Sequence, residues 1–215
     1  MNFSKSLAAA TSTVALALVM AGSAGATNIV AGGTVSPSVF GGNLGTETLL
    51  ATTGVVNFST TVGLTVEAGT YQASVYRSGS FLDFVYTFNE NNSSNTAIQS
   101  ATMANFGSYA ADVSYIVDGN VAPVGTTGSN GATRSADGNV IKFFFPLTGV
   151  SAGQTADTMI IRVTATNYTL GLYTIQNGVT TNLAGYQPTA TPEPATFAMI
   201  GAGLLALGFL RRKNA

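Results

Sequence analysis

The sequence predicts an all-β protein, with a body folded as an antiparallel β-sandwich or a jelly-roll-like variant of one, between two apolar ends. Three observations support this fold class. Apolar and polar residues alternate with period two, turn-forming residues separate the alternating stretches, and only 8% of the residues are charged. Such alternation is typical of strands with one buried face. We expect one domain at residues 27–187, a length that can bury a single hydrophobic core.

The best-defined strands have apolar side chains at every second position. Tyr71, Ala73 and Val75 share one face of their stretch, whereas Arg162 lies on the polar side of another. Residues 97–106 could form a short helix or a further strand, and residues 121–135, rich in Gly, Thr and Pro, indicate a long loop. The alternating stretches are residues 71–77, 113–117, 141–147 and 159–167.

Turn-forming pairs separate these stretches. Asp118-Gly119, Asp137-Gly138 and Asn177-Gly178 favour tight hairpins, because both residues of each pair tolerate positive φ. The two aspartates could also offer oxygens to Ca²⁺, but a calcium loop needs several oxygen ligands within a dozen residues. Neither segment supplies that density, so we expect turns and no metal site.

Residues 1–26 are typical of a secretory signal peptide. A short polar start with Lys5 precedes the apolar stretch Leu7–Met20, and the small residues Ala24 and Ala26 occupy the positions that signal peptidase reads. We expect a signal helix that signal peptidase removes by cleavage after Ala26. A retained transmembrane helix is the alternative, but the apolar run is shorter than the ~20 residues that a bilayer requires.

The C-terminal residues have three parts after a short linker at residues 188–191. As a helix, the apolar part would reach roughly 24 Å, slightly less than the usual hydrocarbon thickness. The basic residues favour a cytoplasmic C-terminus, so we expect a single transmembrane helix with the body outside the membrane. The three parts are Pro192, Glu193 and Pro194; the apolar stretch Ala195–Leu210; and the basic cluster Arg211, Arg212 and Lys213.

The segment at residues 192–215 resembles the PEP-CTERM sorting signal, which has the same three parts in the same order. The resemblance implies recognition by exosortase, a membrane-embedded transpeptidase-like enzyme of Gram-negative bacteria that make exopolysaccharide. It also implies that the tripeptide is a substrate motif rather than an active site. Two prolines keep such a motif extended and unpaired. A plain membrane anchor remains the alternative. Three blocks of the body resemble PEP-CTERM proteins without a known activity: residues 80–88, 139–145 and 161–168.

The absence of Cys and His excludes several kinds of chemistry. No disulfide, Cys nucleophile or Ser-His-Asp triad can form, and the commonest metal ligands are missing. The body has four basic side chains against eight acidic ones, a balance that argues against nucleic-acid binding. We therefore expect no catalytic residue, no metal and no cofactor.

Two weaker candidates for a functional site remain in the body. Asp83 and Glu90 could serve as paired carboxylates, but seven positions apart on an extended chain they face opposite sides. We expect Asp83 to be a buried or edge residue hydrogen-bonded to the backbone. Aromatic residues between Tyr71 and Tyr173 could include a sugar-stacking platform, although most should lie in the core.

These observations predict an exported, non-enzymatic cell-surface or extracellular protein with a structural or adhesive role in an exopolysaccharide or biofilm layer. Its expected partners are signal peptidase, exosortase and the membrane, with an exopolysaccharide as a further one. The first alternative is a carbohydrate-binding module of the cell surface. The second is a carboxylate hydrolase, which would need at least two acids close together in a cleft.

Overall fold

The computed structural model describes residues 25–125 and 131–189. The expected signal helix, apart from the cleavage position Ala26, and the sorting tail with its transmembrane helix lie outside the described residues. Ala26 directly precedes the first strand, which begins at Thr27. Within the described residues, no helix is long and apolar enough to cross a membrane.

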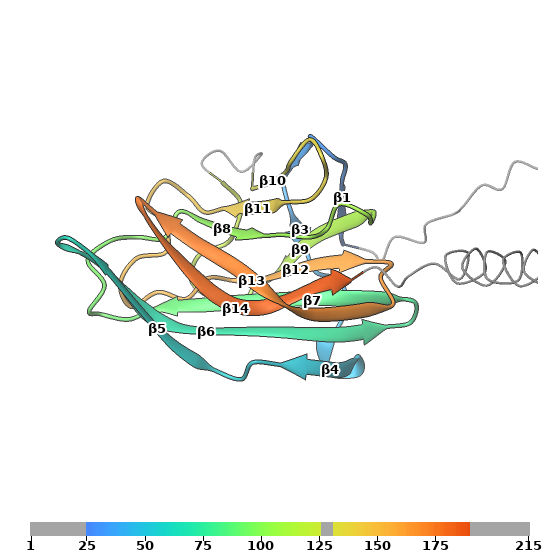
Figure 1. Cartoon of the computed structure of the whole chain (residues 1–215), viewed down its shortest axis with the longest axis horizontal. Coiled ribbons are helices and arrows are strands. Elements are labelled where there is room, and N and C mark those ends of the chain that lie inside the picture. The colour runs from blue at the N-terminus through green and yellow to red at the C-terminus, as the bar shows by residue number, and fades with distance from the viewer. Residues whose placement is uncertain (1–24, 126–130, 190–215) are drawn as a thin grey trace, which may run out of the picture.

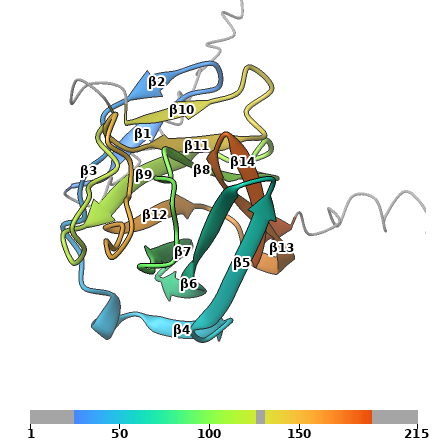
Figure 2. The same cartoon turned by 90° about the vertical axis from the view of Figure 1, so that its left-hand side faces the viewer.

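The body is all-β, as predicted, and its strands form two sheets that pack face to face (Figures 1 and 2). The larger sheet contains β1 (Thr27–Ile29), β3 (Ser38–Val39), β4 (Thr48–Thr52), β5 (Val56–Val62), β6 (Thr65–Ser78), β7 (Phe81–Glu90), β9 (Ala111–Ile116) and β12 (Thr158–Val163). The smaller sheet contains β2 (Thr34–Val35), β8 (Ser100–Met103), β10 (Ala132–Arg134), β11 (Ile141–Phe144), β13 (Asn167–Asn177) and β14 (Val179–Thr189).

Strand pairing in both sheets is antiparallel except between β3 and β9. The eight-stranded sheet has the order β1-β9-β12-β7-β6-β4, with β3 also on β9 and β5 also on β6. The six-stranded sheet has the order β14-β13-β8-β11-β10-β2. At one margin the two sheets approach each other, where β5 contacts β14 (Figure 2).

The hydrophobic core lies between the two sheets and is built from the predicted apolar stripes. Tyr71, Ala73 and Val75 on β6 are buried in it, as are alternate residues of β12. The aromatic rings of Tyr86 and Tyr173, one from each sheet, lie 5.2 Å apart across the interface. The stripe at residues 141–147 ends earlier than predicted: Leu147 is 77% exposed, because Pro146 has no N–H to continue a strand.

Two segments that were uncertain or misjudged from the sequence are strands. Residues 97–106 contain β8 at the centre of the six-stranded sheet. The prediction of one long loop at residues 121–135 was wrong, because residues 132–134 form β10 between β2 and β11. The sequence pairs Asp137-Gly138 and Asn177-Gly178 form turns as predicted, and both glycines have positive φ.

The two ends of the sandwich differ. The described chain starts at Gly25 and stops at Thr189 on the right-hand side of Figure 1, which we call the proximal end. The turn of the β5–β6 hairpin projects on the opposite side, which we call the distal end. Leu64 at this turn is 94% exposed, and its carbonyl accepts a hydrogen bond from Asn95 in the loop at residues 91–97. Strand β14 continues to Thr189, so only two residues separate it from Pro192.

Candidate ligand-binding face

The outer face of the six-stranded sheet carries a continuous row of polar side chains. Strand alternation turns residues such as Ile141 and Phe143 of β11 into the core and leaves Lys142 and Phe144 outside. Antiparallel pairing then aligns one outward residue from each of the six strands. From β2 to β14, across the sheet, this polar row consists of Thr34, Thr133, Lys142, Thr102, Thr174 and Asn182.

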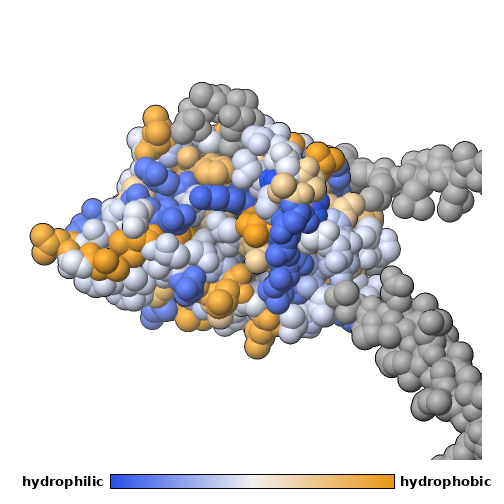
Figure 3. Space-filling view, turned by 45° about the horizontal axis from the view of Figure 1, so that its top comes forward, coloured by the Kyte–Doolittle hydropathy of each residue, from blue (hydrophilic) through white to orange (hydrophobic). Residues whose placement is uncertain are grey.

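The polar row is almost uncharged. Lys142 is its only ionised member, and the hydroxyl of Thr174 donates a hydrogen bond to Oδ1 of Asn182 at 3.0 Å. Figure 3, in which the top of Figure 1 comes forward, shows a surface that is mostly pale or blue with separate orange patches. This face therefore offers many hydroxyl and amide groups to a ligand and few charges.

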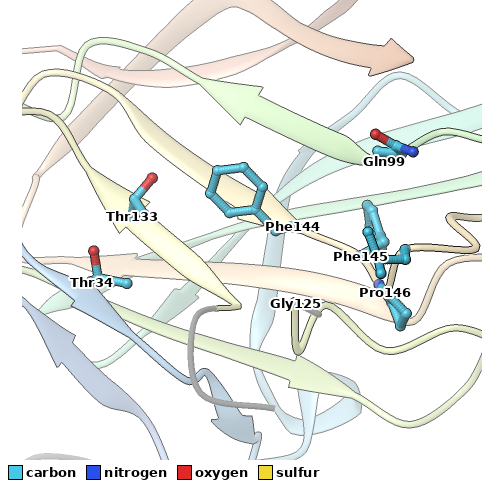
Figure 4. Close-up of a pocket in the computed structure, with 8 residues that line it drawn as sticks. Thr34, Gln99, Gly125, Thr133, Phe144, Phe145 and Pro146 are labelled. Atoms are coloured by element: carbon cyan, nitrogen blue, oxygen red, sulfur yellow. The ribbon is translucent and has the colours of Figure 1, made fainter. Parts of the chain in front are cut away.

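A groove beside the polar row exposes the ring of Phe144 (Figure 4). The groove has a volume of about 330 Å³, and a smaller depression of about 250 Å³ also borders the ring of Phe144. The ammonium of Lys142 lies 5.0 Å from the centre of the ring. The groove is lined by Thr34, Gln99, Gly125, Thr133, Phe144, Phe145, Pro146 and Leu147, and the depression adds Ser100, Lys142, Gln176, Asn177 and Gly178.

The chemistry of this face is stacking and hydrogen bonding. Phe144 provides a flat apolar ring, while the amides of Gln99 and Gln176 and the surrounding hydroxyls provide donors and acceptors. None of the residues that line the groove or the depression is a carboxylate, so these residues cannot form the pair of acids that a carboxylate hydrolase needs. The sequence placed Phe144 among many aromatic candidates, and only the sheet register identifies its polar neighbours.

Asp83, a candidate from the sequence, lies on the outer face of the eight-stranded sheet. It is fully buried and sits directly opposite Arg162 on the paired strand. Nε of Arg162 donates to Oδ1 of Asp83 at 2.6 Å, and Nη2 donates to Oδ2 of Asp83 and, at 3.1 Å, to Glu47. The expectation of a backbone-bonded Asp83 was therefore wrong. Glu90 lies on the other face of β7, toward the core, as predicted.

The ion triad of Glu47, Asp83 and Arg162 does place two acids close together. Burial, followed by the charge of Asp83, raises the pKa of Glu47. The rings of Phe40 and Phe81 lie 5.5 and 5.7 Å from the guanidinium of Arg162. A depression of about 460 Å³ borders Glu47 and Arg162, but Asp83 is 0% exposed and both of its oxygens are bonded to Arg162. We therefore assign the triad a structural role.

Both aspartates of the predicted Asp-Gly turns anchor the backbone, but only the one at Asp137 lies in a hairpin. The prediction of a hairpin at Asp118 was wrong, because the strand before it, β9, and the strand after it, β10, belong to different sheets. Oδ1 of Asp118 accepts from the N–H of Thr158 at 2.9 Å, and Oδ1 of Asp137 accepts from the N–H of Asn139 at 3.0 Å. Hydrogen bonds from Ser135 and then from Asn139 lower the pKa of Asp137. Within residues 25–125 and 131–189, no group of three or more acidic, His or Cys side chains could hold a metal ion.

Comparison with known proteins locates one motif. A family model described as the PEP-CTERM protein-sorting motif matches residues 190–213. No curated protein and no solved structure matches the chain. The matched residues include the tripeptide Pro192–Pro194 and the basic cluster Arg211–Lys213, both predicted from the sequence. The chain therefore carries a PEP-CTERM protein-sorting motif at residues 190–213, which indicates an exported protein that exosortase recognises and that is anchored in the membrane before it is processed.

Proposed function

We propose that the mature body is a non-enzymatic surface protein with a structural or adhesive role in an exopolysaccharide or biofilm layer. The observation that carries this proposal is the outer face of the six-stranded sheet, where an almost uncharged polar row adjoins the Phe144 groove. Such a face can hold an extended polar ligand, because its hydrogen-bonding groups repeat across six strands. The buried, ion-paired state of Asp83 supports the absence of catalysis.

The groove also favours a more specific reading, that of a carbohydrate-binding module. A sugar ring has an apolar C–H face and polar edges, so it can stack on an aromatic ring while neighbouring amides and hydroxyls bond its hydroxyl groups. Phe144, Gln99, Gln176 and Thr133 provide this combination. Since Lys142 is the one charged residue that borders the groove or the depression, a neutral glycan is the better match.

Replacing Phe144 by alanine should weaken the retention of the protein on polysaccharide about tenfold, which corresponds to ~1.4 kcal/mol of binding free energy. The ring is only partly buried, so the fold should persist. Retention would be measured on the exopolysaccharide of the native host and on an array of neutral glycans. Leu172→Ala is the matched control, because Leu172 is 61% exposed on β13 but lies outside the groove. If neither polysaccharide nor array retains the wild-type protein, the carbohydrate-binding reading fails.

Processing at the tail can be tested by intact-mass measurement of extracellular and membrane-bound protein from the native host. We expect an extracellular species that begins at Thr27 and ends near Pro192, and that disappears when exosortase is deleted. A triple variant with alanine in place of Pro192, Glu193 and Pro194 should likewise leave a membrane-bound species that retains Arg211–Lys213. Gly201→Ala, inside the apolar stretch, is the control and should still be processed. If the host with exosortase and the host without it both contain a single membrane-bound species that retains Arg211–Lys213, the tail is a plain anchor instead.

A further inference from the structure

Two glutamates lie between the sheets at the distal end, and neither has a cationic partner among the described residues. Glu90, at the end of β7, pairs with Gly69 of β6, so Glu67 is its diagonal neighbour on the next strand. Both side chains point to the inner face, where β6 and β7 contribute Tyr71 and Phe88 to the core. Both glutamates are 0% exposed.

Each glutamate has one bonded and one unbonded carboxylate oxygen. The hydroxyl of Thr181, on β14 of the opposite sheet, donates to Oε2 of Glu67 at 2.5 Å. The hydroxyl of Ser94, in the loop at residues 91–97, donates to Oε1 of Glu90 at 2.9 Å. Oε1 of Glu67 and Oε2 of Glu90 are buried and have no hydrogen-bond partner within residues 25–125 and 131–189. A buried carboxylate left in this state strongly favours its protonated form.

In the part of the chain that the structure describes, the elements around the pair offer no positive charge. Strand β5, the loop at residues 91–99 and the segment at residues 145–154 contain no ionisable side chain. On β14 the only ionisable residue is Tyr186, which packs against Tyr168 near the proximal end. The other titratable groups that face this part of the core are the tyrosines Tyr71 and Tyr173, whose ring centres lie 5.8 Å apart. The two ion pairs of the described residues both involve Arg162.

Ionisation of the pair is therefore costly. Burial raises the pKa of Glu67, and burial together with the charge of Glu67 raises the pKa of Glu90 to about 7. The folded state thus holds protons that the unfolded chain has already lost, so the free energy of unfolding decreases as the pH rises through this range. Two like charges in this buried position would add their mutual repulsion to the cost of burial.

The pair also connects the elements that close the distal end. Glu67 is bonded to β14 through Thr181, and Glu90 is bonded to the loop at residues 91–97 through Ser94. The same loop is fixed to the β5–β6 hairpin, because Oδ1 of Asn95 accepts from the N–H of Val66 at 2.8 Å. We propose that Glu67 and Glu90 form a proton-controlled latch, which keeps this loop and the start of β14 packed until both carboxylates ionise. This latch is independent of the proposed adhesive role.

Hydrogen exchange of the full-length chain in detergent tests the latch, measured from about pH 5.5 to about pH 8.5 and corrected for the intrinsic pH dependence of exchange. We expect the amides of residues 91–97 and 179–183 to lose protection about tenfold with rising pH, while those of β12 do not. The double variant E67Q/E90Q should abolish this change, because its side chains cannot ionise. Asp137→Asn is the control, since Asp137 is an exposed acid at a turn.

A second variant keeps the test informative if E67Q/E90Q folds poorly. Ser94→Ala removes one bond that holds the loop and also the hydrogen bond that lowers the pKa of Glu90. Protection of the loop should therefore be lower throughout, but the pH at which it falls further should move upward. Exchange that does not depend on pH in the wild type, or the same dependence in E67Q/E90Q, would overturn the proposal. Protection restored at high pH by millimolar Ca²⁺ in the wild type alone would also overturn it, because the pair would then bind a metal cation rather than a proton.

Discussion

Replacement of Arg162 by methionine should lower the free energy of unfolding by about 3–5 kcal/mol, the usual cost of removing one partner from a buried ion pair. Asp83 would remain 0% exposed without a cation, and Glu47 would lose its bond to the guanidinium. The deficit should shrink as the pH falls, because protonation removes the uncompensated negative charges. Thermal and urea unfolding of the full chain in detergent, followed by circular dichroism, would measure both effects.

Two further variants test whether the stability lost in Arg162→Met comes from the broken ion pair. Arg77→Met is the matched control, because Arg77 is partly exposed and donates one hydrogen bond, at 3.1 Å, to the carbonyl of Thr166. Its expected cost is below ~1 kcal/mol. The double variant D83L/R162M should recover much of the lost stability, since apolar replacements of a buried ion pair are often neutral or stabilising. An Arg162→Met protein as stable as the wild type would contradict the structural role of the triad.

Replacement of Arg134 by methionine should be similarly damaging, for a different reason. The guanidinium of Arg134 is bonded to four backbone carbonyls and to no carboxylate among the described residues. It connects Ile29 at the end of β1, the loop at Phe106 and Tyr109, and the turn at Gly138, with donor–acceptor distances of 2.6 to 3.0 Å. Each buried carbonyl left unbonded costs about 1–3 kcal/mol unless water reaches it. We expect a net loss of about 3–4 kcal/mol, since water would satisfy some of these carbonyls.

The Arg134 prediction has a matched control and a second observable. Lys142→Met removes a cation from a partly exposed strand position, where the one side-chain hydrogen bond among the described residues, to Gln176, is 3.5 Å long. Its cost should stay within ~0.5 kcal/mol. Hydrogen exchange should localise the effect of Arg134→Met to residues 27–29 and 106–109. Uniform loss of protection over the whole body would argue against this local role of Arg134.

Strand positions could be predicted from the sequence where apolar and polar residues alternate over a long stretch and the apolar residues share one face. Residues 71–77 and 159–165 fulfil that condition, and both stripes are buried as expected. Strand β10 could not be recognised, because Ala132, Thr133 and Arg134 are too short a run to show a period. Arg134 looks like a surface residue in sequence, and only the folded chain brings four carbonyls to it.

The candidate sites likewise combine features that the local sequence predicts with features that only the folded chain creates. The alternation of Ile141, Phe143 and Phe145 implies that Phe144 faces outward, but the residues beside it come from three other strands. Arg162 was placed on the polar side of its strand, and it does face away from the core between the sheets. It is buried nevertheless, because residues near Phe40 cross the outer face of the eight-stranded sheet and cover it. Such coverage depends on long-range packing, which local periodicity does not contain.

The short connection between Thr189 and Pro192 limits how far the body of the anchored precursor can lie from the membrane. With two residues between β14 and the sorting motif, the proximal end must rest close to the bilayer. The fourteen residues of β6 span about 46 Å at ~3.3 Å per residue, so an upright molecule would raise its distal end to roughly that height. The outer face of the six-stranded sheet, which carries Phe144, would then stand perpendicular to the bilayer and face neighbouring molecules. A polymer bound to that face, as proposed above, would run between neighbouring molecules and would link them into a mat before exosortase processes them.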